Sequence, residues 1–89
     1  MMIGKVVGTV VATRKNDKLV GSKLLIVEPL DDKNKGNISG RLIAIDNVGA
    51  GVGDDVLVVL GSGARVGCNM QDAPIDAAIV GIIDTITEL

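Results

Sequence analysis

The stretch of residues 44–65 constrains this chain more than any other, because it alternates β-branched runs with glycine. Its sequence is AIDNVGAGVGDDVLVVLGSGAR, which we interpret as strand, loop, strand and loop. In the first loop, Gly49, Gly51 and Gly53 occupy every second position. Glycine tolerates positive φ and close backbone approach. The pattern therefore predicts a tight loop packed against something that leaves no room for side chains.

A glycine triplet of this kind also suggests a phosphate cradle, but the flanking residues argue against one. A dinucleotide-binding fingerprint needs a helix directly after the glycines, within a long βαβ unit. Here Asp54 and Asp55 follow, and they lead into a β-branched run that predicts a strand. Two carboxylates would also repel a phosphate. We therefore interpret the stretch as a structural loop, for which a subunit contact is one setting.

The composition of the chain favours an oligomer. Its 89 residues make one predicted domain, residues 1–89, and a chain this short has a marginal core. Yet 47% of the residues are hydrophobic. A small domain with this much aliphatic surface has more to bury than one core can hide. Association with further copies would cover a second face.

The residue types that are missing exclude most chemistry. The sequence has no aromatic residue and no His, so it lacks the usual general base and the commonest metal ligand. Its one cysteine, Cys68, can form neither an intrachain disulfide nor a cysteine metal cluster. We therefore expect no histidine-based catalysis and no metal site built on histidine or cysteine.

Charge and hydropathy also limit the partners and the location. The net charge is −2 and the nine basic residues are scattered, whereas a nucleic-acid surface needs a basic stripe. Lys5 and Gly8 interrupt the first apolar run, which argues against a signal peptide. No apolar run approaches the length that spans a membrane. We expect a cytoplasmic protein that contacts neither nucleic acid nor membrane.

Almost the whole chain is predicted to be β-structure. We expect strands at residues 2–14, 23–30, 41–46, 56–61 and 78–86, with Gly4 and Gly8 on one face of the first. Residues 31–40 are predicted to be a solvated loop. Residues 74–77 are predicted to be one helical turn, because Pro74 suits a first-turn position.

The last strand supports the prediction of a ring. Ile79 and Ile83 alternate with Val80 and Ile82, so both faces of this strand are apolar. A strand that is apolar on both faces is covered on both faces. A lone small barrel covers only its inner face, so we expect a neighbouring subunit on the outer face.

These elements predict an all-β fold, a small, partly open, five-stranded OB-like barrel with one short helical turn before the last strand. Such barrels often bind single-stranded nucleic acid through aromatic platforms and a basic groove. This chain has neither feature, so a structural building block is favoured. An OB-like ligand- or oligonucleotide-binding module is the alternative.

Three motifs carry a resemblance to a known family. The N-terminal GKVVGTVVATRK…GSKLLIVEPL, the central stretch and the C-terminal PIDAAIVGIIDTI are similar, in the same order, to the EutN/CcmL family. These are pentameric vertex proteins of bacterial microcompartment shells, found in carboxysomes and in ethanolamine- and propanediol-type organelles. The resemblance implies a cyclic homopentamer in the shell, with hexameric tile proteins as partners, no catalysis, no cofactor and no metal.

The resemblance also implies where copies meet. Five residues match the central glycine loop of the family, namely Asn47, Gly49, Ala50, Gly51 and Gly53. Ser62, Ala64 and Arg65 match a segment near the five-fold axis, where Gly63 stands in place of a serine. Together with Ile79 and Ile83, these residues form the expected subunit interface or five-fold axis.

Two of the charged residues have more than one interpretation. Arg65 either closes a surface turn or pairs across subunits with a carboxylate such as Asp46 or Asp84, which would suit its planar fork. Asp76 is interpreted as bonding its own turn.

Overall fold

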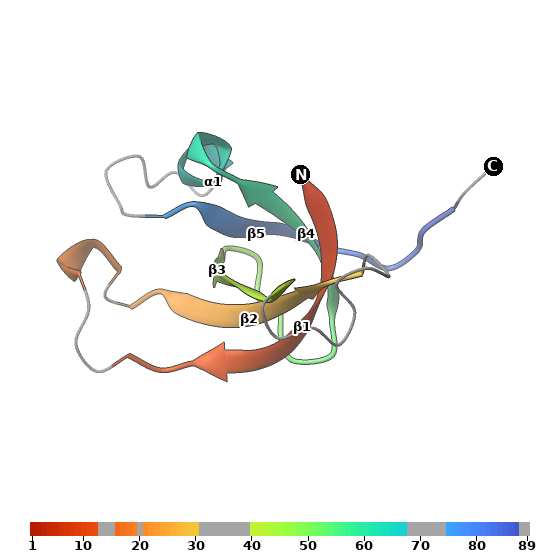
Figure 1. Ribbon diagram of the computed structural model, residues 1–89, viewed down its shortest axis with the longest axis horizontal. Coiled ribbons are helices and arrows are strands. Elements are labelled where there is room, and N and C mark those ends of the chain that lie inside the picture. The colour runs from red at the N-terminus through yellow and green to blue at the C-terminus, as the bar shows by residue number, and fades with distance from the viewer. Residues whose placement is uncertain (13–15, 20, 31–39, 68–74, 88–89) are drawn as a thin grey trace.

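The computed structural model describes residues 1–12, 16–19, 21–30, 40–67 and 75–87. These residues form, in chain order, β1 (Met2–Val10), the short helix η1 (Asp17–Leu19), β2 (Lys23–Pro29), β3 (Leu42–Asp46), β4 (Asp55–Leu60), α1 (Ser62–Gly67) and β5 (Ala77–Ile82) (Figure 1). Each predicted strand is present, although β5 ends at Ile82 and not at residue 86. The predicted loop at 31–39, Cys68 and Pro74 lie outside the described residues.

The strands close into a barrel with the order β1-β2-β3-β5-β4. β3 and β5 pair in parallel, and the other neighbouring strands pair antiparallel. This arrangement confirms the predicted small five-stranded barrel, which is closed and not partly open. Closure removes exposed strand edges. The chain between β4 and β5 carries α1, which lies against the outside of these two strands (Figure 1).

The barrel interior is filled by the alternate residues of every strand, as the period of two requires. These side chains are small or branched aliphatics, which suits a narrow five-stranded barrel. The buried cluster consists of Val6, Leu25, Val27, Ala44, Ala50, Val56, Val58, Ala77 and Ile79. A second buried cluster lies outside the barrel wall and is formed by Ile45, Ala64, Ile75 and Ala78. Its members come from β3, β5, α1 and the residues just before β5.

A bulge in β1 corrects the predicted faces of its glycines. The pairing of β1 with β2 shifts register between Val6 and Gly8. As a result Gly4 is buried, whereas a Cβ on Gly8 would lie 3.2 Å from Ile26 Cδ1 on the outer face. The expectation that Gly4 and Gly8 share a face was therefore wrong. A bulge adds one residue to a strand and so reverses the facing of every later residue.

The short helix is also displaced from its predicted place. The described part of residues 74–77 is not helical, and Ala77 already begins β5. The helix is α1, which follows Gly61, a residue with φ of 66°. The glycines of this segment lower its helix propensity, so the sequence pattern does not indicate a helix here. In the fold they allow close contact, because a Cβ on Gly63 would lie 3.0 Å from Val59 Cγ1.

No helix that the structure describes is long and apolar enough to cross a membrane.

Gly4 gives a direct test of how tightly the barrel is packed. A Cβ built on Gly4 would lie 2.3 Å from Val27 Cγ1 and 3.0 Å from the carbonyl oxygen of Glu28. Backbone cannot move aside as a flexible side chain can, so we expect Gly4→Ala to overpack the barrel by about 1–3 kcal/mol. Thermal unfolding followed by circular dichroism should show a Tm lowered by about 4 °C or more.

Gly81→Ala is the matched control, because a Cβ there would lie 3.6 Å from Leu57 Cβ, an ordinary contact. Both variants should be melted at one protein concentration, since association makes Tm depend on concentration. Equal Tm values for the two variants would contradict the tight packing at Gly4.

Candidate functional site

The glycine loop between β3 and β4 is built on the carboxylate of Asp46. Its Oδ1 accepts from the backbone N–H groups of Val48 and Ala50, each at 3.1 Å. Its Oδ2 accepts from the N–H of Gly49, also at 3.1 Å. The Asp46 side chain is only 4% exposed, and Lys23 Nζ lies 3.6 Å from its Oδ2. One buried carboxylate at the end of β3 therefore fixes the first half of the loop.

The second half of the loop is held by a second carboxylate and by β1. Asp54 Oδ2 accepts from the N–H of Gly51 at 2.9 Å. The N–H of Gly53 donates to the carbonyl of Val6 at 2.8 Å, and the N–H of Val6 donates to the carbonyl of Asp54 at 2.9 Å. The loop is thus joined to β1 beside its bulge.

This hydrogen bonding explains why the loop is not a phosphate cradle. Three consecutive N–H groups, from Val48 to Ala50, do converge on one point as they would around an anion. The anion is the carboxylate of Asp46, which belongs to the chain itself. The sequence argument against a phosphate rested on a missing helix, and the geometry adds that these donors are already occupied.

The three glycines of the loop, Gly49, Gly51 and Gly53, have different structural roles. Gly49 and Gly53 have φ of 85° and 96°, where L-residues are strained. Gly51 does not have a positive φ, and a Cβ on any of the three would meet nothing within 4 Å among the residues that the structure describes. The predicted tight packing is therefore absent from the described part of the chain. Gly49 and Gly53 are explained by the backbone conformation, whereas no described neighbour requires a glycine at position 51.

Side chains of the loop divide between the inside and the outside of the barrel. Ala50 is fully buried in the barrel cluster. Lys23 Nζ donates to the carbonyl of Ala50, which holds that residue in place. Val48 and Val52 point outward and are 40% and 64% exposed. Asn47 reaches α1, where its Nδ2 donates to the carbonyl of Gly67 at 3.4 Å.

The second predicted site, residues 62–65, forms the first turns of α1. Ala64 is fully buried in the outer cluster, and Gly63 is half-buried against β4. Arg65 Nη1 donates to the carbonyl of Ile75 at 3.1 Å. This bond joins α1 to the chain entering β5. Within its own chain Arg65 therefore connects two segments, and its pairing across subunits with a carboxylate stays a prediction. Asp46, one of the suggested partners, accepts hydrogen bonds from the glycine loop of its own chain.

The two isoleucines predicted for the subunit interface, Ile79 and Ile83, lie in different environments. Ile79 is fully buried inside the barrel of its own chain, so its side chain cannot be the outer face of β5. The prediction placed Ile79 and Ile83 on the same face by strict alternation. This was wrong because β5 has an irregularity opposite Leu57 and Val58, which interrupts the alternation. Ile83 is half-buried just after β5, and its N–H donates to the carbonyl of Asp55 at 2.8 Å.

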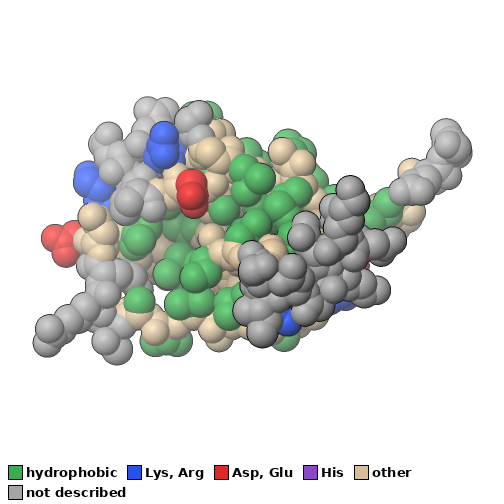
Figure 2. Space-filling model, in the orientation of Figure 1, with side chains coloured by type: hydrophobic (Ala, Val, Ile, Leu, Met, Phe, Trp, Pro, Cys, Tyr) green, Lys and Arg blue, Asp and Glu red, His purple; other side chains and the backbone are tan. Residues whose placement is uncertain are grey.

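An apolar surface on β2 and β3 was missed by the sequence reasoning. Cross-strand pairing places Leu24 opposite Ile45 and Ile26 opposite Ile43, on the outside of the barrel. Ile43 is 53% exposed. Apolar side chains cover much of the middle of the face seen in Figure 2. Both faces of β2 are aliphatic, so the argument used for the last strand could have found this surface.

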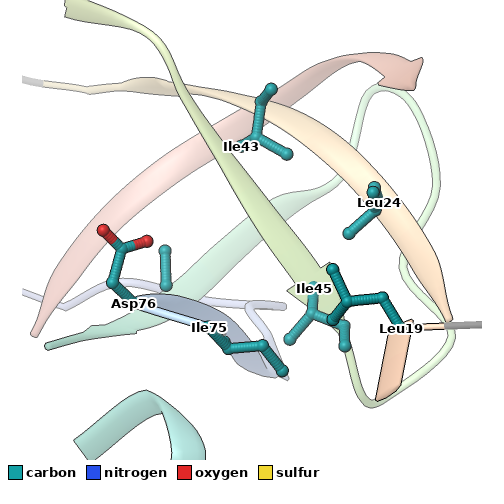
Figure 3. A pocket seen from close by; sticks show the side chains of 7 residues that line it. Leu19, Leu24, Ile43, Ile45, Ile75 and Asp76 are labelled. Atoms are coloured by element: carbon teal, nitrogen blue, oxygen red, sulfur yellow. The ribbon is translucent and has the colours of Figure 1, made fainter. Parts of the chain in front are cut away.

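This surface is hollowed at one end into a groove of about 220 Å³. Leu24 and Ile43 line one side of the groove, and Ile75 and Asp76 line the other (Figure 3). Leu19 of η1 packs against the buried cluster at its floor. Among the described residues no group of His, Cys, Asp or Glu could hold a metal ion. The arrangement offers aliphatic contact and rigid loops, which suit docking of protein and not reaction chemistry.

Comparison with known proteins agrees with this description. Residues 1–84 match the family model described as ethanolamine utilisation protein EutN/carboxysome. The chain is 48% identical to the microcompartment shell vertex protein GrpN of Rhodospirillum rubrum, over 97% of this chain and 96% of that protein. It is also 48% identical to the carboxysome shell vertex protein CcmL of a Synechocystis species, over 97% of this chain and 85% of that one.

A solved structure extends the similarity to three dimensions. The GrpN pentameric microcompartment shell protein from Rhodospirillum rubrum superposes with a TM-score of 0.84 at 45% identity. The match covers the whole of both chains.

A pair of valine substitutions tests the different roles of the loop glycines. Gly53→Val places a β-branched residue at φ of 96°, at a cost of about 1–3 kcal/mol. Gly51→Val enters open space without a positive φ. We expect Gly53→Val to lower the Tm by several degrees more than Gly51→Val does. A loss of Tm in Gly51→Val that grows on dilution would report a contact with a neighbouring copy, so only equal losses that do not depend on protein concentration would contradict this assignment.

Removal of the Asp46 carboxylate tests whether it organises the loop. Asp46→Ala leaves three N–H groups without their acceptor and should lower the free energy of unfolding by about 3 kcal/mol or more. Asp54→Ala is the control, because that side chain accepts from one loop N–H. Urea unfolding of both variants at one concentration gives the comparison. An equal loss in the control would show that Asp46 has no special part.

Proposed function

This chain belongs to the EutN/CcmL family, and we propose that it forms a homopentamer that caps the vertices of a polyhedral bacterial microcompartment shell. The observation that carries the proposal is the match over the full length of both chains to a pentameric shell protein. The role is structural and not catalytic, as the relatives are named shell vertex proteins.

We further propose hexameric shell tiles as the partners of the pentamer. A sheet of hexagonal tiles is flat, and closing it into a polyhedron requires five-fold units at the corners. A five-fold unit at a corner must carry a rim that fits a tile as well as surfaces that fit further copies of itself. Firm surfaces beside the strands are better candidates for that rim than flexible loops, because ordering a flexible segment costs entropy.

The glycine loop and the first turns of α1 are proposed to face neighbouring copies or the five-fold axis. The geometry of the loop supports this placement. The loop is fixed by Asp46 and carries exposed Val48 and Val52, and a Cβ on Gly51 would meet no described atom of its own chain within 4 Å. Asn47 links the loop to the end of α1, so the two segments belong to one surface. Ala50 and Ala64 lie beneath this surface and support it by packing, because both are fully buried.

The alternative of an oligonucleotide-binding barrel gains no support from the site. The sequence has no aromatic residue for base stacking, and its net charge is −2. The loop amides that converge like an anion site are engaged by the chain's own carboxylates.

Assembly and shell closure together test the proposal. Native mass spectrometry at micromolar concentration should show a pentamer. Shell tiles expressed without this protein should form open, elongated or leaky particles, because a flat hexagonal sheet cannot close. Addition of the protein should give closed particles that retain an encapsulated reporter, seen by electron microscopy and by reporter release.

A dominant monomer or dimer would contradict the pentamer. The vertex role would be contradicted if shells closed and kept their reporter equally well without this or any homologous vertex protein.

A further inference from the structure

Lys23 at the start of β2 lies directly opposite Asp46 at the end of β3. The side chains of directly opposed residues are neighbours on one face of an antiparallel pair. Here the Nζ of Lys23 is 3.6 Å from Asp46 Oδ2. The same Nζ donates to the carbonyl of Ala50. One ammonium group therefore connects β2 both with the end of β3 and with the glycine loop.

Both backbone polar groups of Ala50 are held by this pair of side chains. Its N–H donates to Asp46 Oδ1 at 3.1 Å, and its carbonyl accepts from Lys23 Nζ. The peptide planes on the two sides of Ala50 are thereby fixed, and so is the direction of the side chain between them. This side chain is fully buried in the barrel cluster. We call the Lys23–Asp46 pair the clamp, since it keeps Ala50 in the barrel.

The two members of the clamp differ in exposure. The Asp46 side chain is 4% exposed, whereas the Lys23 side chain is 49% exposed. A buried carboxylate is costly unless it is hydrogen-bonded and paired with a cation. Three loop N–H groups supply the hydrogen bonds, and Lys23 supplies the positive charge. Lys23 thus acts on the loop partly through Asp46 and partly through the carbonyl of Ala50.

Beyond Ala50 the loop is anchored to β1, because the N–H of Gly53 donates to the carbonyl of Val6 at 2.8 Å. Val52 lies in the chain between this anchor and the clamp, and it is 64% exposed. Val48 lies just before Ala50, on the side of the clamp, and it is 40% exposed. The direction in which both valines point therefore depends on the clamp.

We infer that Lys23 is a positioning residue for the surface that this loop presents. The clamp holds Ala50 in the barrel, and the loop then presents Val48 and Val52 in one fixed orientation. The clamp itself is a property of the single chain. Its consequence for assembly rests on the proposed function, in which the loop faces neighbouring copies or the five-fold axis. Because Lys23 is half exposed, the clamp can be weakened from the solvent side while the core stays intact.

Replacement of Lys23 by methionine tests the clamp. Lys23→Met keeps an unbranched apolar stem but removes the charge and the N–H donors. Hydrogen–deuterium exchange resolved to single residues should show the amide of Ala50 exchanging about 10-fold faster or more, since a hydrogen bond to a charged group is lost. The amide of Leu25 in β2 should exchange as in the wild type, because the barrel core is unchanged. All variants are compared at concentrations that give them the same oligomeric state.

Two further variants serve as controls. Lys23→Arg keeps the charge and the donors, so it should retain most of the protection of the Ala50 amide. Lys18→Met removes the same charge from η1, where Lys18 forms no ion pair with a described residue, and it should exchange as the wild type does. Unchanged exchange of Ala50 in Lys23→Met, an equal increase in either control, or an equal increase at Leu25 would each overturn the clamp.

Salt gives the same test on the wild-type chain if Lys23→Met does not fold. Raising NaCl from about 0.1 M to about 1 M screens a partly exposed ion pair. The amide of Ala50 should then exchange faster while that of Leu25 does not. An Ala50 amide that salt leaves unaffected would overturn the clamp.

Native mass spectrometry on dilution tests the consequence for assembly. Lys23→Met should dissociate at a protein concentration about 10-fold higher than the wild type, whereas Lys23→Arg and Lys18→Met should match the wild type. Faster exchange of Ala50 without a change in dissociation would overturn the role of Lys23 in assembly. A wild-type chain that is not pentameric would instead refute the proposed function, and the exchange result would then decide whether the clamp stands by itself.

Discussion

The strands of this barrel are aliphatic on both faces, but a five-stranded barrel buries only one of them. Small branched side chains fill the interior, and α1 covers the outside of β4 and β5. Aliphatic surface remains on β2 and β3, where Ile43 is 53% exposed, and on β1. Water disfavours this exposure in proportion to the area. The sequence of the strands therefore already carries a driving force for association, before any contact with another shell component.

The glycine loop shows how local chemistry makes a rigid surface from a flexible sequence. Glycine-rich segments lose much conformational entropy when they become ordered. Here Asp46 supplies one acceptor group for three consecutive N–H donors, and Asp54 supplies another for Gly51. Asp54, one of the two carboxylates that argued against a phosphate site in the sequence, is thus one of the groups that order the loop. A loop fixed in this way can present Val48 and Val52 to another surface without a further entropy cost.

Sequence reasoning predicted the strands, the barrel and the family, because period-two aliphatic patterns and glycine loops are local signals. It did not predict which side of the barrel a residue faces where the register between two strands shifts. The bulge in β1 moved Gly8 to the outside, and the irregularity opposite β4 turned Ile79 inward. It also failed at α1, where glycines lower helix propensity but let the helix approach Val59 and Val80. The conformation of the glycine loop depends on Asp46. The sequence does not reveal this role, because only the fold brings the N–H groups of residues 48–50 together around the carboxylate.

The core inside the barrel and the exposed aliphatic surface outside it respond to substitution in two different ways. A defect such as a side chain at Gly4 acts inside one barrel, so it lowers the stability of the folded chain at any protein concentration. A charge placed on exposed Ile43 would leave the core intact, so any effect that it has through association would depend on protein concentration. The exposed aliphatic surface of β2 and β3 is built on strands whose other faces form the core, so it is held in place by the barrel itself. A surface that is already ordered loses little conformational entropy when it contacts another protein.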